Sequence, residues 1–261
     1  MLTFVKLGGS LITDKSGKTA FRAEMMDQLA GEIAAALTDM PDSQFLLGHG
    51  SGSFGHVPAK EHGTAAGVQT PQQWRGFAEV ATVAAALSGL VTDSLHRAGV
   101  PVWRMQPSAS ARCVDGQVVE MALHPVRAAL DHGLVPLVHG DVALDDVRGG
   151  TIVSTESIFR YLSAHLPVSR ILLLGEVKGV YDSEGTVIPE ITPANIERYA
   201  AALGGSSGTD VTGGMLTKVL DMLDLVISHP GLTVRILDGR EPGLLGRTLR
   251  GEINVGTLIR A

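Results

Sequence analysis

Cysteine is almost absent from this chain: Cys113 is the only one among 261 residues. A single thiol cannot form an intramolecular disulfide, and it cannot supply the several cysteine ligands of a structural metal site. We interpret Cys113 as a partly buried thiol without a catalytic role. Stability must therefore come from a hydrophobic core, which a chain of this length can build without cross-links.

An excess of basic residues and a long apolar run are also missing. The chain has 21 Lys and Arg against 27 Asp and Glu, with a net charge of −6. Proteins that bind nucleic acids normally present a basic face, so the charge disfavours that class. No segment approaches the ~18 apolar residues of a membrane span, and the sequence MLTFVKLGGS lacks the features of a secretory signal. We expect a cytoplasmic protein that binds neither membranes nor nucleic acids.

Short apolar runs alternate with longer segments of helical period along the chain. This alternation predicts the α/β class, with a mostly parallel central sheet sandwiched by helices. The 32 glycines and the low aromatic content of 4% suit a compact protein with many tight turns. The predicted strands are 3–7, 44–48, 100–105, 135–138, 170–174 and 233–237, and the predicted helices are 23–37, 71–98, 124–132, 154–165, 193–203 and 215–228.

The sequence also predicts two lobes with a cleft between them. Residues 142–153 contain Asp145-Asp146 and Gly149-Gly150 between apolar runs, which predicts a hairpin at the joint. We place the boundary near residues 166–169, so the lobes span 1–166 and 167–261. No Ser/Pro-rich linker is present, which favours a continuous sheet or a tight interface, with the active site in the cleft.

The first of three glycine-rich stretches is Lys6-Leu7-Gly8-Gly9-Ser10. Glycines that leave a strand let backbone N–H groups approach a polyphosphate without Cβ clashes, and Lys6 adds a positive charge beside them. A tight turn would explain the two glycines equally well. It would not explain a lysine in an otherwise apolar strand, so we interpret this stretch as a phosphate-binding loop.

The second stretch, GHGSGSFGH, covers residues 48–56 and contains G-x-G-x-x-G. A dinucleotide-binding unit would need a second strand ending in an acidic residue about 20 residues later. Residues 67–74 read GVQTPQQW, so that requirement is not met. We interpret the stretch as an anion-binding loop with His56 at its far end, able to donate a hydrogen bond to a phosphate oxygen.

The third stretch is DVTGGMLTK, residues 210–218, where a glycine turn opens a helix that carries Lys218. A helix start presents unpaired N–H groups and a partial positive charge, to which Lys218 adds a full one. A simple helix cap with a solvated lysine is an equally good reading of this stretch alone. Gly17-Lys18-Thr19 resembles the end of a Walker A loop, but Ile12 stands where its first glycine is required.

Taken together, KLGGS, GHGSGSFGH, VHGDV, VKGVYD and DVTGGMLTK resemble the amino acid kinase family, in the same order along the chain. GHGSGSFGH is similar to its isopentenyl phosphate kinase branch in particular. The resemblance runs from Lys6 to Lys218 and implies transfer of a phosphoryl group from ATP to isopentenyl phosphate. It also implies that the N-terminal lobe binds the acceptor, that the C-terminal lobe binds the nucleotide, and that the active form is a homodimer.

The resemblance implies two sets of binding residues and a catalytic set. Lys15 would stabilise the transferring phosphoryl group, and Asp141 would orient the lysines. The expected catalytic set is Lys6, Lys15, His56 and Asp141. The acceptor phosphate would meet Ser51, Gly55, His56 and Gly140. The ATP side would comprise Lys6, Gly8, Gly9, Ser10, Gly52, Glu176, Tyr181, Asp182, Gly214 and Lys218.

One stretch departs from the family pattern. The family commonly has T-D-x-D-G before V-Y-D, whereas this chain has Gly175-Glu176-Val177-Lys178-Gly179. Glu176 can still supply a carboxylate, but Lys178 reverses a charge on the nucleotide side, which bears on nucleotide preference and not on the reaction type.

Phosphoryl transfer between two anions needs charge neutralisation more than a base, because an ionised phosphate oxygen is already a nucleophile. We expect Mg²⁺ to bind the ATP oxygens and retain several waters, with no metal-ligating residue from the chain. The apolar stripe of residues 77–91, with Phe77, Val80, Ala84 and Leu87, predicts core packing, and its members nearest the cleft could line a slot for a five-carbon tail.

Two alternatives remain open. A fosfomycin-type phosphonate kinase of the same fold would share the phosphate loop and His56 but need a smaller, polar tail pocket. A regulatory protein that binds nucleotide without catalysis would keep the fold, although the presence of Lys6, Lys15, Lys218 and His56 argues against it.

Overall fold

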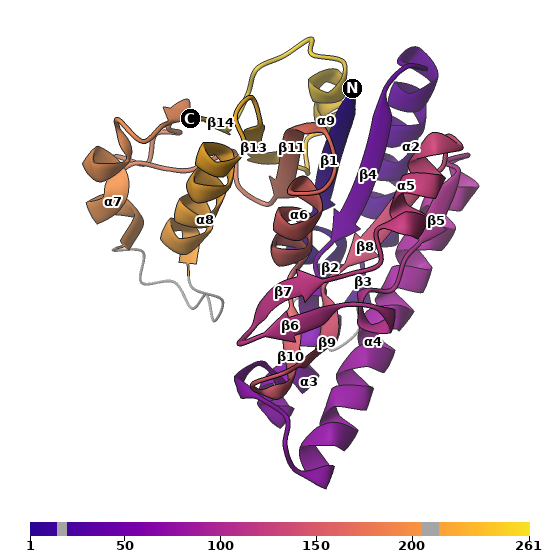
Figure 1. Cartoon of the computed structure of the whole chain (residues 1–261). Coiled ribbons are helices and arrows are strands. Elements are labelled where there is room, and N and C mark those ends of the chain that lie inside the picture. The colour runs from indigo at the N-terminus through magenta and orange to yellow at the C-terminus, as the bar shows by residue number, and fades with distance from the viewer. Residues whose placement is uncertain (15–19, 205–213) are drawn as a thin grey trace.

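The computed structural model describes residues 1–14, 20–204 and 214–261 of the chain, with side chains of 201–204 left out of the description. Figure 1 shows one large sheet flanked by helices. The sheet has eight strands in the order β12-β14-β13-β11-β1-β4-β8-β5. All neighbouring pairs are parallel except β13 and β14. In chain order the strands are β1 (Leu2–Leu7), β4 (Gln44–His49), β5 (Val102–Arg104), β8 (Val135–His139), β11 (Val168–Gly175), β12 (Glu190–Ile191), β13 (Thr233–Asp238) and β14 (Thr257–Ile259).

Helices cover both faces of this sheet, as the α/β pattern predicts. Alternate residues of a strand point to opposite faces, so Phe4 and Val5 of β1 belong to two different buried clusters. The cluster of Val5 includes side chains of α1 (Gly9–Ile12), α2 (Ala23–Asp39), α3 (Gly52–His62), α4 (Pro71–Arg97) and α9 (Leu244–Leu249). The cluster of Phe4 includes α5 (His124–Asp131), α6 (Thr155–Ser163) and α8 (Gly214–Ser228), the last of which packs on α7 (Ile196–Gly204).

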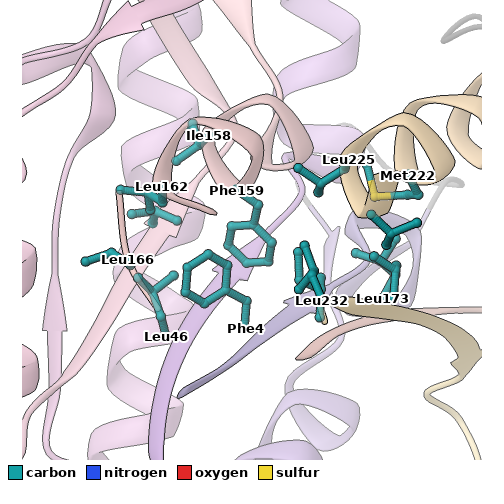
Figure 2. Close-up of a cluster of buried hydrophobic side chains, with 14 of the residues drawn as sticks. Phe4, Leu46, Ile158, Phe159, Leu162, Leu166, Leu173, Met222, Leu225 and Leu232 are labelled. Carbon is teal, nitrogen blue, oxygen red and sulfur yellow. The ribbon is translucent and has the colours of Figure 1, made fainter. Parts of the chain in front are cut away.

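Aromatic packing fixes the position of α6 on the sheet. The rings of Phe4 and Phe159 have centroids 5.0 Å apart at 53°. Figure 2 shows both rings at the centre of a cluster that also contains Leu46 from β4 and Met222 from α8. This contact holds the start of α6 close to the end of β1.

A smaller sheet of four strands lies beside the carboxyl end of the large one, in the order β10-β9-β6-β7. Its strands are β6 (Arg112–Val114), β7 (Gln117–Glu120), β9 (Asp141–Asp145) and β10 (Gly149–Val153). β9 and β10 form the hairpin that the sequence predicts over residues 142–153. Short strands β2 (Thr13–Asp14) and β3 (Ala20–Phe21) form a further antiparallel pair.

The buried carboxylate of Asp145 joins the two turns of the smaller sheet. It accepts hydrogen bonds from the backbone N–H groups of Asp115, Gly116, Val147 and Arg148 at 2.6–3.1 Å. Burial alone would raise its pKa, but these four donors outweigh burial and leave the pKa of Asp145 below its ordinary value.

Most predicted strands and helices are confirmed to within a few residues, and one important helix was missed. Residues 52–62 form α3, of which 52–56 were interpreted as part of a loop and 57–62 were left unassigned. The helix contains Pro58 and two glycines and so has low intrinsic helix propensity. The strand predicted over 100–105 is limited to Val102–Arg104. The large sheet runs without interruption across the predicted lobe boundary, because β1 pairs with β4 on one side and β11 on the other.

The longest helix, α4, begins with a capping box formed by Thr70 and Gln73. Its length and composition alone would allow it to cross a membrane. The helix is amphipathic, however, and Val80, Ala84 and Leu87 are buried on one face. This burial is the pattern of a core helix, and it agrees with the core packing predicted for the stripe.

Candidate functional site

The candidate site lies where parallel strands end and helices begin. β1 is followed directly by α1 and β4 by α3, so both helices start at the carboxyl edge of the sheet. Ligands of open α/β sheets bind at this edge, where helix N-termini present free N–H groups. The first two glycine-rich stretches of the sequence are the connections between these strands and helices.

These two glycine stretches pack directly against each other. A Cβ atom on Gly9 would lie 2.4 Å from the Gly52 backbone nitrogen, and one on Gly50 would lie 2.8 Å from the Gly9 nitrogen. Gly52 has φ of +51°, and a Cβ there would lie 2.1 Å from Thr13 Oγ1. No side chain fits at these contacts. The β1–α1 and β4–α3 connections therefore touch backbone to backbone at Gly9, Gly50 and Gly52.

Two lysines from distant parts of the chain share one carboxylate beside these connections. Lys6 Nζ donates a hydrogen bond to Glu156 Oε1, and Lys218 Nζ lies 4.0 Å from the same oxygen. Lys6 is on β1, Glu156 in the first turn of α6 and Lys218 on α8. Glu156 thus brings together Lys6 from the first glycine-rich stretch and Lys218, the last residue of the third.

Burial and charge act in opposite directions on this cluster. Burial lowers the pKa of Lys6 more than the neighbouring Glu156 raises it. For Glu156, burial alone would raise the pKa, but the charges of Lys6 and Lys218 outweigh it and leave the pKa below its ordinary value. The cluster carries a net positive charge when all three groups are ionised, which suits a polyanionic ligand.

The acceptor residues predicted around Ser51 and Gly140 are also brought together. Ser51 Oγ donates a hydrogen bond of 3.0 Å to the Gly140 carbonyl oxygen. Gly55 lies one turn into α3, and a Cβ there would come within 2.4 Å of the Ser51 Cβ. The end of β4 and the connection between β8 and β9 are therefore held side by side.

His56 lies in the second turn of α3, not at the end of a loop, and its side chain is exposed. It lines a hollow of about 480 Å³ together with Val57, Lys60 and Glu61 from the same helix. The helical register thus points His56 outward beside its helical neighbours, while Ser51 faces the backbone of Gly140. Lys15, the remaining catalytic candidate, lies outside the described residues.

Asp141 is buried at the start of β9. Its buried carboxylate accepts hydrogen bonds from the Ser108 and Val142 backbone N–H groups, at 3.1 and 2.9 Å. Within the described part of the chain, Glu156 is the carboxylate seen beside Lys6 and Lys218. Glu156 is absent from the sequence prediction because an acidic residue in the first turn of a helix is common and usually serves the helix dipole.

The residues predicted on the nucleotide side are spread over the ends of β11 and α8. Glu176 accepts a hydrogen bond of 2.7 Å from Arg22 and so links the end of β11 to the start of α2. Tyr181 is exposed, and Asp182 accepts from the Glu184 and Thr186 N–H groups within its own turn. Gly214 begins α8 with φ of +69°.

Comparisons with known proteins point to one family. The model of the amino acid kinase family matches residues 1–238. Isopentenyl phosphate kinase of Haloferax volcanii is 38% identical over 96% of this chain and 99% of its own length, and that of Methanothermobacter thermautotrophicus is 32% identical over 99% and 98%. A crystal structure of isopentenyl phosphate kinase superimposes with a TM-score of 0.84, at 28% identity over 99% of this chain and all of the other. This chain belongs to the amino acid kinase family.

Proposed function

We propose that the protein transfers the γ-phosphate of ATP to isopentenyl phosphate, giving isopentenyl diphosphate and ADP. The observation that carries the proposal is the meeting of Lys6 and Lys218 at Glu156, beside the joined glycine stretches. Full-length similarity to proteins named isopentenyl phosphate kinase gives the acceptor. It disfavours both the fosfomycin-type kinase and the inactive regulatory protein.

In this proposal the chain neutralises and aligns two anions. Lys6, Lys218 and the N–H groups of Gly9 and Ser10 hold the ATP phosphates, while the Gly8 N–H donates to the Leu174 carbonyl at 2.8 Å and anchors the loop to β11. Glu156 keeps the two ammonium groups at a fixed separation. No general base is required, because the acceptor phosphate is ionised. Lys15 keeps the role that the resemblance implies, stabilisation of the transferring group.

Magnesium would accompany ATP. The described residues contain no group of three or more His, Cys, Asp or Glu side chains placed to hold a metal ion. A Mg²⁺ ion carried by phosphate oxygens and water, as is usual for this ion, fits such a site. The charge of the ion would offset the negative charge of the transferring phosphoryl group.

The acceptor side comprises Ser51, Gly55, His56 and Gly140. His56 would donate a hydrogen bond to the acceptor phosphate from the second turn of α3. The stripe of α4 that could border the tail is buried from Val80 onward, while Phe77 packs near Gly150 of the hairpin and against Trp74. Phe77 therefore lies beside the hairpin.

We also propose a cytoplasmic homodimer with the nucleotide on the C-terminal lobe. Edge strand β5 exposes Trp103, and the adjacent helix α4 exposes Leu90. Arg104 of β5 donates to the Ala85 carbonyl of α4, so these exposed groups belong to one side of the molecule. Light scattering after size-exclusion chromatography would measure the mass of the particle. A dimer would have twice the 27.3 kDa of the single chain.

The decisive experiment is an ADP-release assay with Mg-ATP and five acceptors in parallel: isopentenyl phosphate, dimethylallyl phosphate, fosfomycin, UMP and glutamate. We expect the highest kcat/KM with isopentenyl phosphate and a diphosphate product by ³¹P NMR. A strong preference for fosfomycin, UMP or glutamate would overturn the acceptor assignment. ATP turnover with none of the five would support the regulatory alternative.

A further inference from the structure

Two buried histidines form a stacked pair beneath the candidate acceptor site. His49 ends β4 and His139 ends β8, and they are partners in the register of these parallel strands. Their rings are 5.3 Å apart between centroids and within 13° of parallel. Both side chains are essentially inaccessible, at 1% and 0% exposure. Neither residue was singled out from the sequence, where each looks like the polar end of a strand.

Each ring makes the same hydrogen bond to the glycine that follows it. His49 Nδ1 lies 3.1 Å from the Gly50 carbonyl oxygen, and His139 Nδ1 lies 3.1 Å from that of Gly140. A carbonyl oxygen only accepts, so Nδ1 must carry the proton in both rings. Each Nε2 then holds a lone pair, and neither Nε2 has a partner within the described structure.

Both rings are held neutral. Burial, followed by the neighbouring His139, lowers the pKa of His49 to about 3. Burial also lowers the pKa of His139, against the opposing effect of Asp141. The positive charges of Lys6 near His49 and Arg104 near His139 act in the same direction as burial. A neutral ring is the form that can keep a lone pair on Nε2 and a single donor on Nδ1.

The Gly140 carbonyl belongs to a wider hydrogen-bond network. The Gly140 oxygen also accepts from Ser51 Oγ, and the Gly140 N–H donates to the His49 carbonyl at 3.1 Å. The same His49 carbonyl accepts a hydrogen bond of 2.6 Å from Thr155 Oγ1, next to Glu156. The network thus connects the ends of β4 and β8 with the starts of α3 and α6.

We propose that the His49–His139 pair is a positioning device that orients the Gly50 and Gly140 segments of the acceptor site through its two Nδ1–H donors. The proposal rests on the proposed function, because it assigns these segments to the phosphoryl acceptor. Neither histidine touches the substrate in this role. Each histidine fixes the peptide unit whose carbonyl it binds. Ser51 connects the Gly140 carbonyl, which His139 binds, to the start of α3.

Variants of His139 separate donation from packing. In His139→Asn the side-chain amide can donate to Gly140 in place of Nδ1, whereas His139→Leu fills similar space without a donor. We expect His139→Leu to lose about tenfold or more in kcat/KM for the acceptor while the KM for ATP stays within twofold. His139→Asn should recover most of the loss. A purely structural role would reduce the amount of active enzyme and leave both KM values unchanged.

His132→Leu is the matched control. The Nδ1 atom of His132 also bonds a carbonyl, that of Ala128, but at the exposed C-terminal end of α5. This variant should behave as the unchanged protein. Equal losses in His139→Asn and His139→Leu, or no loss in His139→Leu, would overturn the proposal.

A second measurement does not depend on activity. Long-range ¹H–¹⁵N spectra of histidine-labelled protein distinguish the two neutral tautomers. We expect two rings in the Nδ1–H form, assigned by the loss of one set of signals in His49→Asn or His139→Asn. The His49 ring should not titrate between pH 5.5 and 8, and the pKa of His139 should lie below its ordinary value because the ring is buried. Nε2–H tautomers, or titration near pH 6.5, would overturn the proposal. If the acceptor panel fails but these spectra hold, the proposed function is at fault and not the pair.

Discussion

Lys6 and Glu156 form an ion pair between the first strand and the start of α6, although 150 positions separate them in the chain. Removing the charge of Glu156 should misplace both Lys6 and Lys218 relative to ATP. We predict that Glu156→Gln lowers kcat by roughly 10²-fold, the scale of effect expected when a reacting group is displaced by about 1 Å. Steady-state kinetics with Mg-ATP and isopentenyl phosphate would measure it.

The same variant should change the pH profile. Lys6 must stay protonated to neutralise phosphate, and Glu156 is the group that raises its already lowered pKa. Without Glu156, the alkaline limb of kcat should move to lower pH. Glu190→Gln is the control, because Glu190 pairs with Arg260 on the surface and should leave the kinetics unchanged. A wild-type kcat in Glu156→Gln would remove this residue from the site.

Sequence reasoning succeeded where a local pattern determines the structure. The strands containing Phe4 and Leu47 were predicted because buried parallel strands read as continuous apolar runs. The helix start at Thr70 is signalled by Pro71 and Gln73. The glycine stretches stood out because close backbone approach excludes a Cβ.

Sequence reasoning failed where the partner is distant in the chain. Glu156 acts through Lys6 and Lys218, and nothing within a few residues of it signals either contact. Nothing in the sequence around His49 or His139 signals a pair. Only the register of β4 and β8 brings the two rings together. Helix α3 was missed because its packing on α4, and not its glycine-containing sequence, stabilises it.

His56 should hold the acceptor phosphate by donation and not by removing a proton. We therefore predict that His56→Gln retains substantial activity, because the amide can still donate. His56→Ala should lose roughly tenfold to a hundredfold in kcat/KM for isopentenyl phosphate, since a hydrogen bond to a charged group contributes about 1.5–3 kcal/mol. The KM for ATP should change little.

His62→Ala is the control for this pair of variants. His62 lies on the same helix but pairs with Glu79, at 2.9 Å. Its kinetics should match those of the unchanged protein. If His56→Gln and His56→Ala were equally inactive while both remained folded, His56 would have to supply charge or transfer a proton.

Asp145 should stabilise the smaller sheet in a pH-dependent way. Its pKa is lowered in the folded protein, so its contribution is complete above the unfolded value of about 3.9 and is lost as the pH falls through the folded value. We predict that Asp145→Asn lowers the free energy of unfolding by roughly 1.5–3 kcal/mol at pH 7, the scale of a charge-assisted hydrogen bond. Urea denaturation at pH 7, 5 and 3.5 would show the difference shrinking at the lowest pH.

Asp146→Asn provides the matched comparison for Asp145→Asn. Asp146 is the next residue and pairs with Arg112 at 2.6 Å, but both side chains are about half exposed. An exposed pair of this kind contributes little. The two variants should therefore differ clearly at neutral pH, and equal unfolding curves would refute the role assigned to the Asp145 hydrogen bonds.

The buried histidine pair should make the fold sensitive to acid well above the range of the carboxylates. His49 has a pKa of about 3 in the folded protein, whereas an unfolded histidine titrates near 6.5. Below pH 6.5 the unfolded chain binds a proton at His49 that the folded chain excludes. The free energy of unfolding therefore decreases as the pH is lowered. Between pH 7 and pH 5 this one residue should remove about 2 kcal/mol from the free energy of unfolding.

The measurement is urea denaturation of the unchanged protein and of His49→Leu at intervals from pH 7.5 to 5. All other titrating groups are common to both chains, so the difference between the two curves reports His49 together with its effect on the neighbouring His139. We expect the curve of the variant to be flatter below pH 6.5, while His132→Leu, at an exposed histidine, follows the unchanged protein. Parallel curves for His49→Leu and the unchanged protein would mean that the folded state accepts a proton at His49, contrary to the neutral pair inferred from its burial and its stacking on His139.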